Sequence, residues 1–335
     1  KQVVERVVAI LNERRLDDLP LGAGPLNTAI GCWLLTRCAG FLGAARSTGY
    51  HEWCQAASSW RCPVDLEEFT IAVYCLIDDL VHESQSDPAW RRVRRRGPAP
   101  LLADAEVLTM EAVGEFLGLD QDVAIYHYFR REHPDFFPAL NRVHRTTFAR
   151  QAANLWAVKE RVWQLLLARV PHDRTLSCVD SVPVPVCRFG RAYACSRFRG
   201  LAAFGRDTGS KATFYGLRTH LRIELPGVVA ALQMAPANVH DRDMVPELVE
   251  GTEGLVLGDR NYWDPKLTAE LARAGSALVA PFKKRASDPD PRGSRRIGRT
   301  RWRMETVAAQ FVERYHLKRI WARDAWHLTS RLLRK

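Results

Sequence analysis

The pattern of apolar residues changes at His172, and this change limits the folds that the chain can adopt. From Asp65 to about residue 170, apolar side chains recur at helical spacing. After His172, short β-rich runs alternate with helical runs. This order predicts an α/β protein: a mixed sheet with helices on both faces, preceded by an all-helical domain.

The second part of the chain contains three β-rich runs followed by alternating helices and strands. The run TLSCVDSVPVPV predicts a first strand that ends near Asp180, and two later runs are joined by Pro226-Gly227 as a hairpin. Asp264 and Pro265 are typical of a helix start. The remaining predicted elements are a helix over 241–250, a strand over 254–259, a helix over 264–275 and a strand over 277–282.

The chain divides into three regions of different composition. Residues 1–62 hold half of the eight cysteines and have weak periodicity, so they stay unassigned. Residues 63–171 form the expected helical domain. Residues 172–335 form the expected α/β domain, with a mobile basic loop over 283–300 and a last helix beginning near Arg301.

The helical region carries its own local predictions. Asp104 is expected to cap a helix that Gly118 ends, and one long amphipathic helix is expected from Arg145 to about residue 170. Five arginines between residues 91 and 96 form either a phosphate contact or a solvated loop.

The charge of the chain favours a polyanionic partner. There are 49 Lys and Arg against 38 Asp and Glu, a net charge of +11. Nucleic acid is therefore the first partner to expect. No run of eighteen apolar residues is present, which predicts no membrane span. Cysteines without a CxxC pair favour free thiols in the cytoplasm.

Three acids lie where this scaffold can bring them together. Asp180 and Asp259 come at the ends of two strands, and Glu305 lies early in the last helix. Each also fits a purely structural role: a helix cap for Asp180, a turn for Asp259 and a surface position for Glu305. Neighbouring strand ends would, however, bring the carboxylates to one ion, and hard oxygen ligands suit Mg²⁺ or Mn²⁺.

Several blocks of the sequence resemble the transposases of bacterial insertion sequences of the DDE class. The blocks are VDSVPVPVCRF, TFYGLRTHLRI, APANVHD, LVLGDRNYW and the segment from Arg301 to Leu332. The resemblance implies that residues 172–335 are the catalytic domain, with a ribonuclease-H-like core in which Asp180, Asp259 and Glu305 are the three catalytic, metal-binding acids. The helical domain over 63–171 would then bind DNA ends or pair subunits. In the IS4-like branch a signature surrounds the third acid; this chain keeps Arg301 but has Gly298 and Val312 at two other signature positions.

The resemblance also implies a reaction and its partners. Two Mg²⁺ or Mn²⁺ ions would activate water for cleavage at the element ends, and the freed 3′-hydroxyl would then attack target DNA. The expected partners are terminal inverted repeats and target DNA, with a homodimer in the complex near the bacterial nucleoid. The residues expected to contact DNA are Arg218, His220, Arg260, Asn261, Arg301, Arg314 and Lys318.

Several residues outside the three acids allow more than one role. Tyr215, Arg218 and His220 are expected to share one strand face, which is either a DNA groove or a solvated surface. His240 and Asp241 are expected to cap a helix. One alternative function is a truncated, inactive transposase remnant that only binds DNA. Another is a zinc-binding regulator built on Cys178, Cys187, Cys195 and a nearby histidine.

Overall fold

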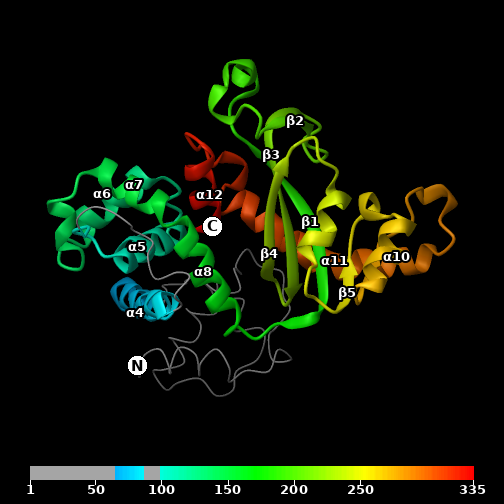
Figure 1. The fold of residues 1–335 in the computed structure, drawn as a ribbon, viewed down its shortest axis with the longest axis horizontal. Coiled ribbons are helices and arrows are strands. Elements are labelled where there is room, and N and C mark those ends of the chain that lie inside the picture. The colour runs from blue at the N-terminus through cyan, green and yellow to red at the C-terminus, as the bar shows by residue number, and fades with distance from the viewer. Residues whose placement is uncertain (1–64, 87–98) are drawn as a thin grey trace, which may run out of the picture. The chain divides into compact units, whose positions relative to one another are not determined.

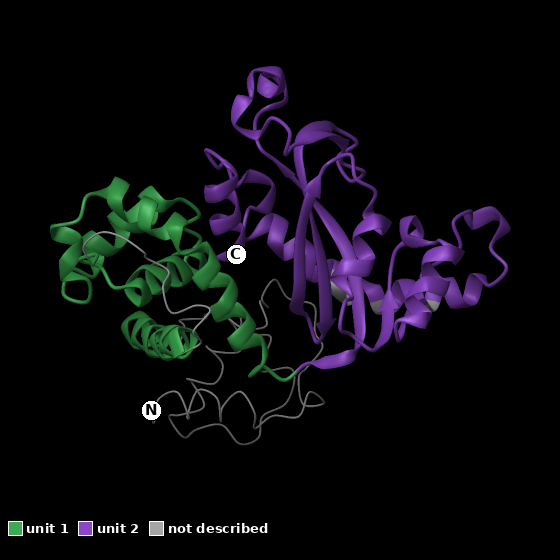
Figure 2. Cartoon of the chain, viewed as in Figure 1, with its two compact units in different colours: residues 1–171 green, residues 172–335 purple. Residues whose placement is uncertain are grey.

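A computed structural model describes residues 65–86 and 99–335 of the chain. It divides into two compact units, residues 1–171 and residues 172–335 (Figure 2). The unassigned segment 1–62 and the arginine run at 91–96 lie outside the described residues, so their predictions are not tested.

The described part of the first unit is built from α-helices around a main apolar core and a smaller apolar cluster (Figure 1). Its largest fully buried side chains include Phe129, Phe148 and Met110. The helices are α4 (Leu66–Ser86), α5 (Asp104–Phe116), α6 (Asp122–Glu132), α7 (Arg145–Asn154) and α8 (Trp156–Leu167), with a short 3₁₀ helix, η4 (Pro138–Asn141).

The prediction of one continuous helix from Arg145 is wrong, because Leu155 divides this segment into α7 and α8. Leu155 leaves helical geometry, with φ −86° and ψ 10°, while its side chain is completely buried. Tertiary packing therefore overrides a helical spacing that continues across the break. The cap of α5 also differs: Asp104 is the first helical residue and Ala103 is the cap, whose N–H donates to the Glu106 carboxylate at 2.6 Å. Gly118 follows the helix at φ +79°, as a helix stop requires.

The second unit contains a six-stranded mixed sheet. The strands are β1 (Asp173–Pro185), β2 (Ala203–Arg206), β3 (Thr213–Leu225), β4 (Val228–Pro236), β5 (Gly254–Leu257) and β6 (Ser276–Val279). Strand β3 is central to one half: it pairs antiparallel with β1, and on its other side with both β2 and β4. Strands β1, β5 and β6 run parallel in the other half. The predicted mixed α/β architecture is confirmed.

Helices cover both faces of this sheet. On one face, α11 (Pro291–Glu313), the 3₁₀ helix η10 (Leu317–Arg319) and α12 (Ala325–Leu333) pack on a core that includes Cys178, Leu221 and Leu257. On the other face, α9 (Val245–Leu248) and α10 (Pro265–Arg273) pack on Val179, Val256 and Leu278. Successive residues of β1 thus face opposite cores, as the strand period of two requires.

Two predicted boundaries in this unit are wrong, and both errors matter for the site. Helix α11 begins at Pro291 rather than near Arg301, so the last ten residues of the expected mobile loop 283–300 are helical. Asp290 caps this start by accepting the Gly293 N–H at 2.9 Å, and Pro291 occupies the first helical position. Strand β1 continues past Asp180 to Pro185 because β3 pairs with it over that whole length.

Candidate active site

Asp180 and Asp259 follow the paired segments of two parallel strands at equivalent positions. The last residue pair between β1 and β5 is Cys178 with Leu257. Each aspartate lies two residues beyond its member of this pair, and a step of two keeps a side chain on the same face. Asp180 is therefore not at a strand end, as predicted, but at the end of the β1–β5 pairing.

Asp180 is a partly buried carboxylate on the face covered by α11. Its Oδ1 accepts the Ser181 backbone N–H at 2.8 Å, and its Oδ2 lies 3.9 Å from the Arg301 guanidinium. Burial raises the pKa of Asp180 to about 6, against the lowering by the Ser181 N–H and Arg301; the charges of Asp259 and Glu305 add to the rise. A positively charged neighbour stabilises the ionised form of such a partly buried carboxylate.

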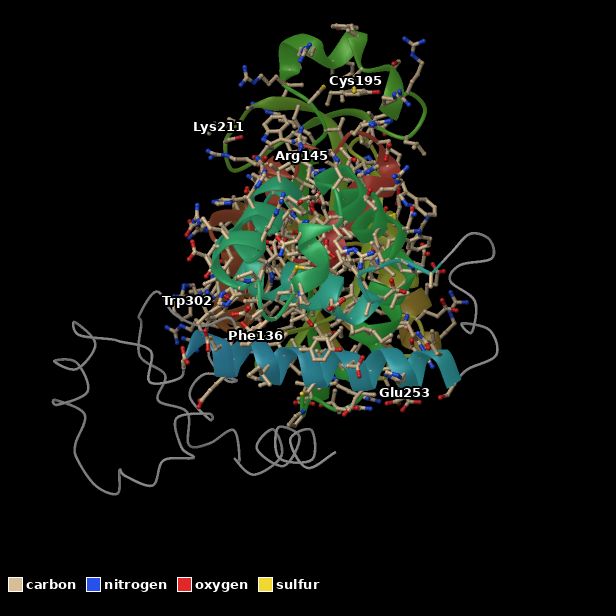
Figure 3. The ribbon with its side chains drawn as sticks, turned by 90° about the vertical axis from the view of Figure 1, so that its left-hand side faces the viewer. Phe136, Arg145, Cys195, Lys211, Glu253 and Trp302 are labelled. Carbon is tan, nitrogen blue, oxygen red and sulfur yellow. The ribbon has the colours of Figure 1, made fainter. Side chains whose placement is uncertain are left out.

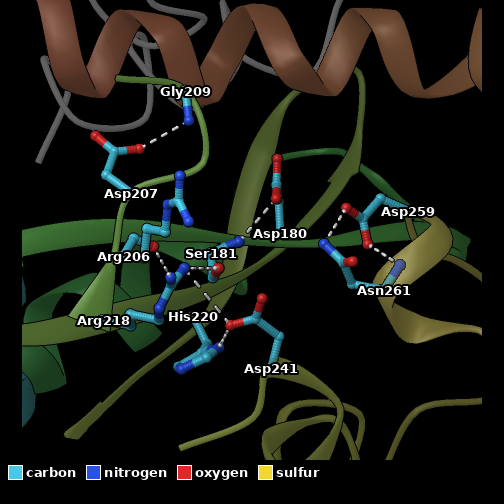
Figure 4. A network of polar contacts seen from close by, with 10 residues as sticks. All are labelled: Asp180, Ser181, Arg206, Asp207, Gly209, Arg218, His220, Asp241, Asp259 and Asn261. Atoms are coloured by element: carbon cyan, nitrogen blue, oxygen red, sulfur yellow. Dashed lines mark hydrogen bonds and ion pairs between the residues drawn. The ribbon is translucent and has the colours of Figure 1, made fainter. Parts of the chain in front are cut away.

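Asp259 caps the short 3₁₀ helix η8 (Arg260–Tyr262). Its Oδ1 accepts the Asn261 backbone N–H at 2.8 Å, and its Oδ2 accepts the Asn261 side-chain N–H at 2.9 Å (Figure 4). Burial raises its pKa, while the Asn261 N–H and Arg301 lower it and Asp241 raises it. Gly258 permits the turn, because a Cβ there would lie 2.6 Å from the Cβ of buried Tyr262.

Glu305 reaches this region through Arg301, one helical turn before it on α11. Glu305 Oε1 lies 3.6 Å from the Arg301 guanidinium, and the Glu305 side chain is 54% exposed. Arg301 itself is buried, and it lies within ion-pair distance of both Asp180 and Glu305. One guanidinium therefore links the first and third predicted acids and also lowers the pKa of the second, Asp259.

The three acids are grouped, but they do not form a closed ligand set. Within the described residues, no three His, Cys, Asp or Glu side chains are close enough together to hold a metal ion. The donor chemistry nevertheless fits a divalent cation, because all three groups are carboxylates and Arg301 shows that a positive charge is accommodated among them. Arg301, a predicted DNA contact, lies within the acid group.

Burial near the acids keeps the Cys178 thiol and the Tyr262 hydroxyl neutral. Cys178 is buried two residues before Asp180, and burial raises the pKa of its thiol to about 12. Burial also raises the pKa of the Tyr262 hydroxyl far above its usual value, with the charges of Asp241, Asp180 and Asp259 adding to the effect. Neither group is an ionised ligand at neutral pH.

The opposite face of β1 carries a second polar group that the sequence did not reveal. Ser181 Oγ accepts from Arg218 at 3.2 Å, and Asp241 lies 3.9 Å from both Arg218 and His220 (Figure 4). His220 is fully buried, and burial lowers its pKa. Asp241 begins the 3₁₀ helix η7 (Asp241–Met244), where His240 occupies the cap position without a side-chain cap bond.

The predicted common face of Tyr215, Arg218 and His220 is wrong, because residue 215 differs from 218 by an odd number of positions. Tyr215 packs into the core on the Asp180 face, whereas Arg218 and His220 lie on the other face. The even spacing of Arg218 and His220 is the signal that the sequence offers for this second group. That spacing does not specify which distant acid the two side chains meet.

The other residues predicted to contact DNA make contacts within the protein. Arg260 donates to the Phe282 carbonyl and lies 3.9 Å from Asp288. Lys318 donates to Asp207 at 2.6 Å. Asn261 is exposed, although its amide is bonded to Asp259, and the Arg314 guanidinium lies 5.9 Å from the Tyr315 ring centre.

The zinc site proposed from Cys178, Cys187 and Cys195 is not assembled. Cys187 lies next to Cys195, beyond the end of β1, and the Cys195 thiol is one cause of a pKa of about 11 for Cys187, after burial. Cys178 lies beneath the acid group instead. No described histidine joins these cysteines in a metal-binding group.

The comparisons with known proteins agree with the geometry of the second unit. Residues 172–320 match a family model described as a transposase DDE domain. No curated protein and no solved structure gives a match to the chain. No helix among the described residues is long and apolar enough to cross a membrane. The second unit of this chain therefore carries a transposase DDE domain, which confirms the resemblance to DDE-class transposases.

Proposed function

We propose that this chain is a DNA transposase that cuts DNA at the ends of an insertion sequence and joins the freed end to target DNA. The observation that carries the proposal is the grouping of Asp180, Asp259 and Glu305 around one buried guanidinium within a transposase DDE domain. The order of the sheet, with antiparallel strands on one side of β1 and parallel strands on the other, supports a ribonuclease-H-like core.

Asp180, Asp259 and Glu305 are the residues that would hold Mg²⁺ or Mn²⁺, with two ions per site. Bound there, such ions would supply Lewis-acid activation of a water or a 3′-hydroxyl and stabilise the leaving oxygen of the cut phosphodiester. The carboxylates themselves supply the negative charge and the hard oxygen donors. Cys178 and Tyr262 are buried near the acids, and burial keeps both groups protonated.

Arg301 is assigned a role as the counter-charge of the acids. It neutralises part of the repulsion between Asp180 and Glu305, which adds to the larger effect of burial in raising the pKa of Asp180. When the acids hold divalent cations, Arg301 would be able to bind a DNA phosphate, as the DNA contact predicted for it requires.

The remaining DNA contacts and partners belong to the same proposal. Arg260 and Asn261 follow Asp259 directly, and Arg314 and Lys318 lie at the end of α11 and just beyond it, where they are suited to hold phosphates. Arg218 and His220 belong to the group behind β1, which supports the position of the strand that carries Asp180. The helical unit would bind the terminal inverted repeats or pair two subunits as a homodimer.

The test is cleavage of duplex DNA carrying the sequences that border the gene, with Mg²⁺, with Mn²⁺ and with EDTA. The wild-type chain should cut only with a divalent ion, and Asp259→Asn should lose cutting while retaining DNA binding in EDTA. Asp243→Asn is the matched control, because Asp243 is an exposed acid in η7. Unchanged cutting by Asp259→Asn would refute the site. Binding without cutting by the wild-type chain would favour the inactive remnant that only binds DNA.

A further inference from the structure

A basic lobe extends the sheet beyond the acid group. Residues 187–206, here called the β1–β2 lobe, connect the end of β1 to β2 through the 3₁₀ helices η5 (Phe189–Ala194) and η6 (Ser196–Phe198). It stands at the top of the second unit in Figure 1. The lobe contains five arginines and no acid, and all five side chains are exposed: Arg188, Arg191, Arg197, Arg199 and Arg206.

The same lobe exposes three aromatic rings that contact one another through Phe204. Tyr193 is 85% exposed, Phe189 is 53% exposed and Phe204 is 40% exposed. The ring centre of Phe204 lies 5.5 Å from that of Tyr193 and 6.1 Å from that of Phe189. Large apolar side chains gathered on a surface indicate an interaction site rather than chance exposure.

The rings stand on a base that is fixed to the sheet. Phe204 pairs with Tyr215 across β2 and β3, with ring centres 5.0 Å apart. Phe198 is buried, and its carbonyl accepts from the Tyr215 hydroxyl at 3.4 Å. A Cβ on Gly205 would lie 2.7 Å from the Ala237 carbonyl oxygen, which shows how closely β2 packs there. The exposed rings are therefore presented by an ordered support.

Exposed rings interleaved with arginines are suited to bind single-stranded nucleic acid. Arginine binds phosphate, and aromatic rings stack on bases that are not already stacked in a duplex. Five arginines without a single acid give the lobe one sign of charge, which favours a polyanionic partner. Figure 3 labels Cys195 within the lobe, where nitrogen-tipped side chains point outward.

We propose that the β1–β2 lobe binds unpaired bases of the DNA that the acid group cuts, with Phe189, Tyr193 and Phe204 as stacking rings. This inference rests on the proposed function and adds a second DNA-binding surface to it. Tyr215 lies on the same sheet face as Asp180, so its strand partner Phe204 does too. From Asp180 to Pro185, β1 spans roughly 17 Å at about 3.3 Å per residue. That length corresponds to about five base-pair steps, so the lobe would hold bases opened close to the cut.

The experiment compares single-stranded and duplex oligonucleotides by fluorescence anisotropy in EDTA, using the full-length chain. Tyr193→Ala should weaken binding of the single strand about fivefold or more and leave the duplex nearly unchanged. Tyr193→Phe is the matched control, because it keeps the ring and should bind as the wild type does. The Arg188→Gln/Arg191→Gln double variant should reduce the salt slope of single-strand binding by about 1.4.

A cross-linking measurement locates the contact independently of affinity. A 5-iododeoxyuridine base placed in the single strand should cross-link to a peptide containing Phe189 or Tyr193. Cross-links found only elsewhere in the chain would overturn the proposal. The proposal would also be overturned if Tyr193→Ala bound the single strand as tightly as the wild type does, or if it lost equal affinity for duplex and single strand. A change in self-association without a change in DNA affinity would overturn it as well.

These outcomes are separable from failure of the acid site. Binding is measured in EDTA, where no cutting takes place, so loss of binding in Tyr193→Ala stands whatever Asp259→Asn does to cleavage. Conversely, metal-dependent cutting that Asp259→Asn abolishes would stand even when the lobe variants bind normally.

Discussion

Replacing Asp180 by asparagine should stabilise the metal-free chain at neutral pH. Burial is the main reason that the pKa of Asp180 rises from 3.8 to about 6. The folded chain therefore holds this proton more tightly than the unfolded chain does. The contribution of Asp180 to folding stability is fully present below about pH 4, where its carboxyl group is protonated in both the folded and the unfolded chain. This contribution is lost as pH rises through about 6.

The size of this effect follows from the shift. Two pKa units correspond to about 3 kcal/mol, since one unit is about 1.4 kcal/mol. The Asp180 side chain is 31% exposed, so solvent screening reduces this figure. We expect a gain of about 1–2 kcal/mol for Asp180→Asn at pH 7.5, or roughly 2–8 °C in melting temperature.

The assay is thermal unfolding of wild type and variant in EDTA between pH 4 and pH 8. The difference should be near zero at pH 4 and complete at pH 7.5, and addition of Mg²⁺ should stabilise only the wild type. Asp207→Asn is the control of opposite sign. Although burial raises the pKa of Asp207, bonds from Lys318 and Ser210 lower it overall, so this variant should lose stability at pH 7.5. A stability gain in Asp180→Asn that does not vary with pH, or no gain at all, would refute the electrostatic account.

Three further predictions concern other parts of the second unit. Gly216→Ala should unfold the chain or strongly lower its unfolding midpoint in urea, because the new Cβ would lie 2.2 Å from the Val184 carbonyl oxygen. Gly190→Ala is the control and should be neutral, because a Cβ there meets nothing within 4 Å. Alkylation of Cys187 by iodoacetamide, followed by mass spectrometry, should be slow at pH 7 and rise roughly tenfold per pH unit towards its pKa of about 11. Rapid labelling at pH 7 would contradict the raised pKa of this half-buried thiol. Asp324→Ala should cost about 1 kcal/mol in denaturant unfolding, because Asp324 caps α12 by accepting the His327 N–H at 3.0 Å, and an unchanged midpoint would show that this cap is not needed.

The elements that the sequence predicts correctly are those with local signals. The β3–β4 hairpin follows from Pro226-Gly227, and α10 follows from Asp264, which accepts the backbone N–H groups of Lys266 and Leu267. Both signals act within a few residues. The sequence also predicts that the strands preceding Asp180 and Asp259 are neighbours, and β1 does pair with β5, although β1 does not end at Asp180.

The parts that could not be predicted depend on distant partners. Strand β2 has four residues and is defined by its pairing with β3. Arg301 and Asp180 lie 121 positions apart in the chain, and only the packing of α11 on β1 brings them into an ion pair. The glycines and arginines of residues 291–300 favour a loop by composition, and the helical start at Asp290 and Pro291 overrides that preference.

The alternation along β1 has a consequence for how this domain tolerates change. Asp180 and Ser181 are neighbours in the chain, yet one meets Arg301 and the other meets Arg218 on the far side of the sheet. Inserting one residue into the strand ahead of Asp180 would exchange the two environments, sending the acid towards Arg218 and His220 and the hydroxyl towards α11. Length variation should therefore be accommodated in the connections around this strand and excluded from its interior.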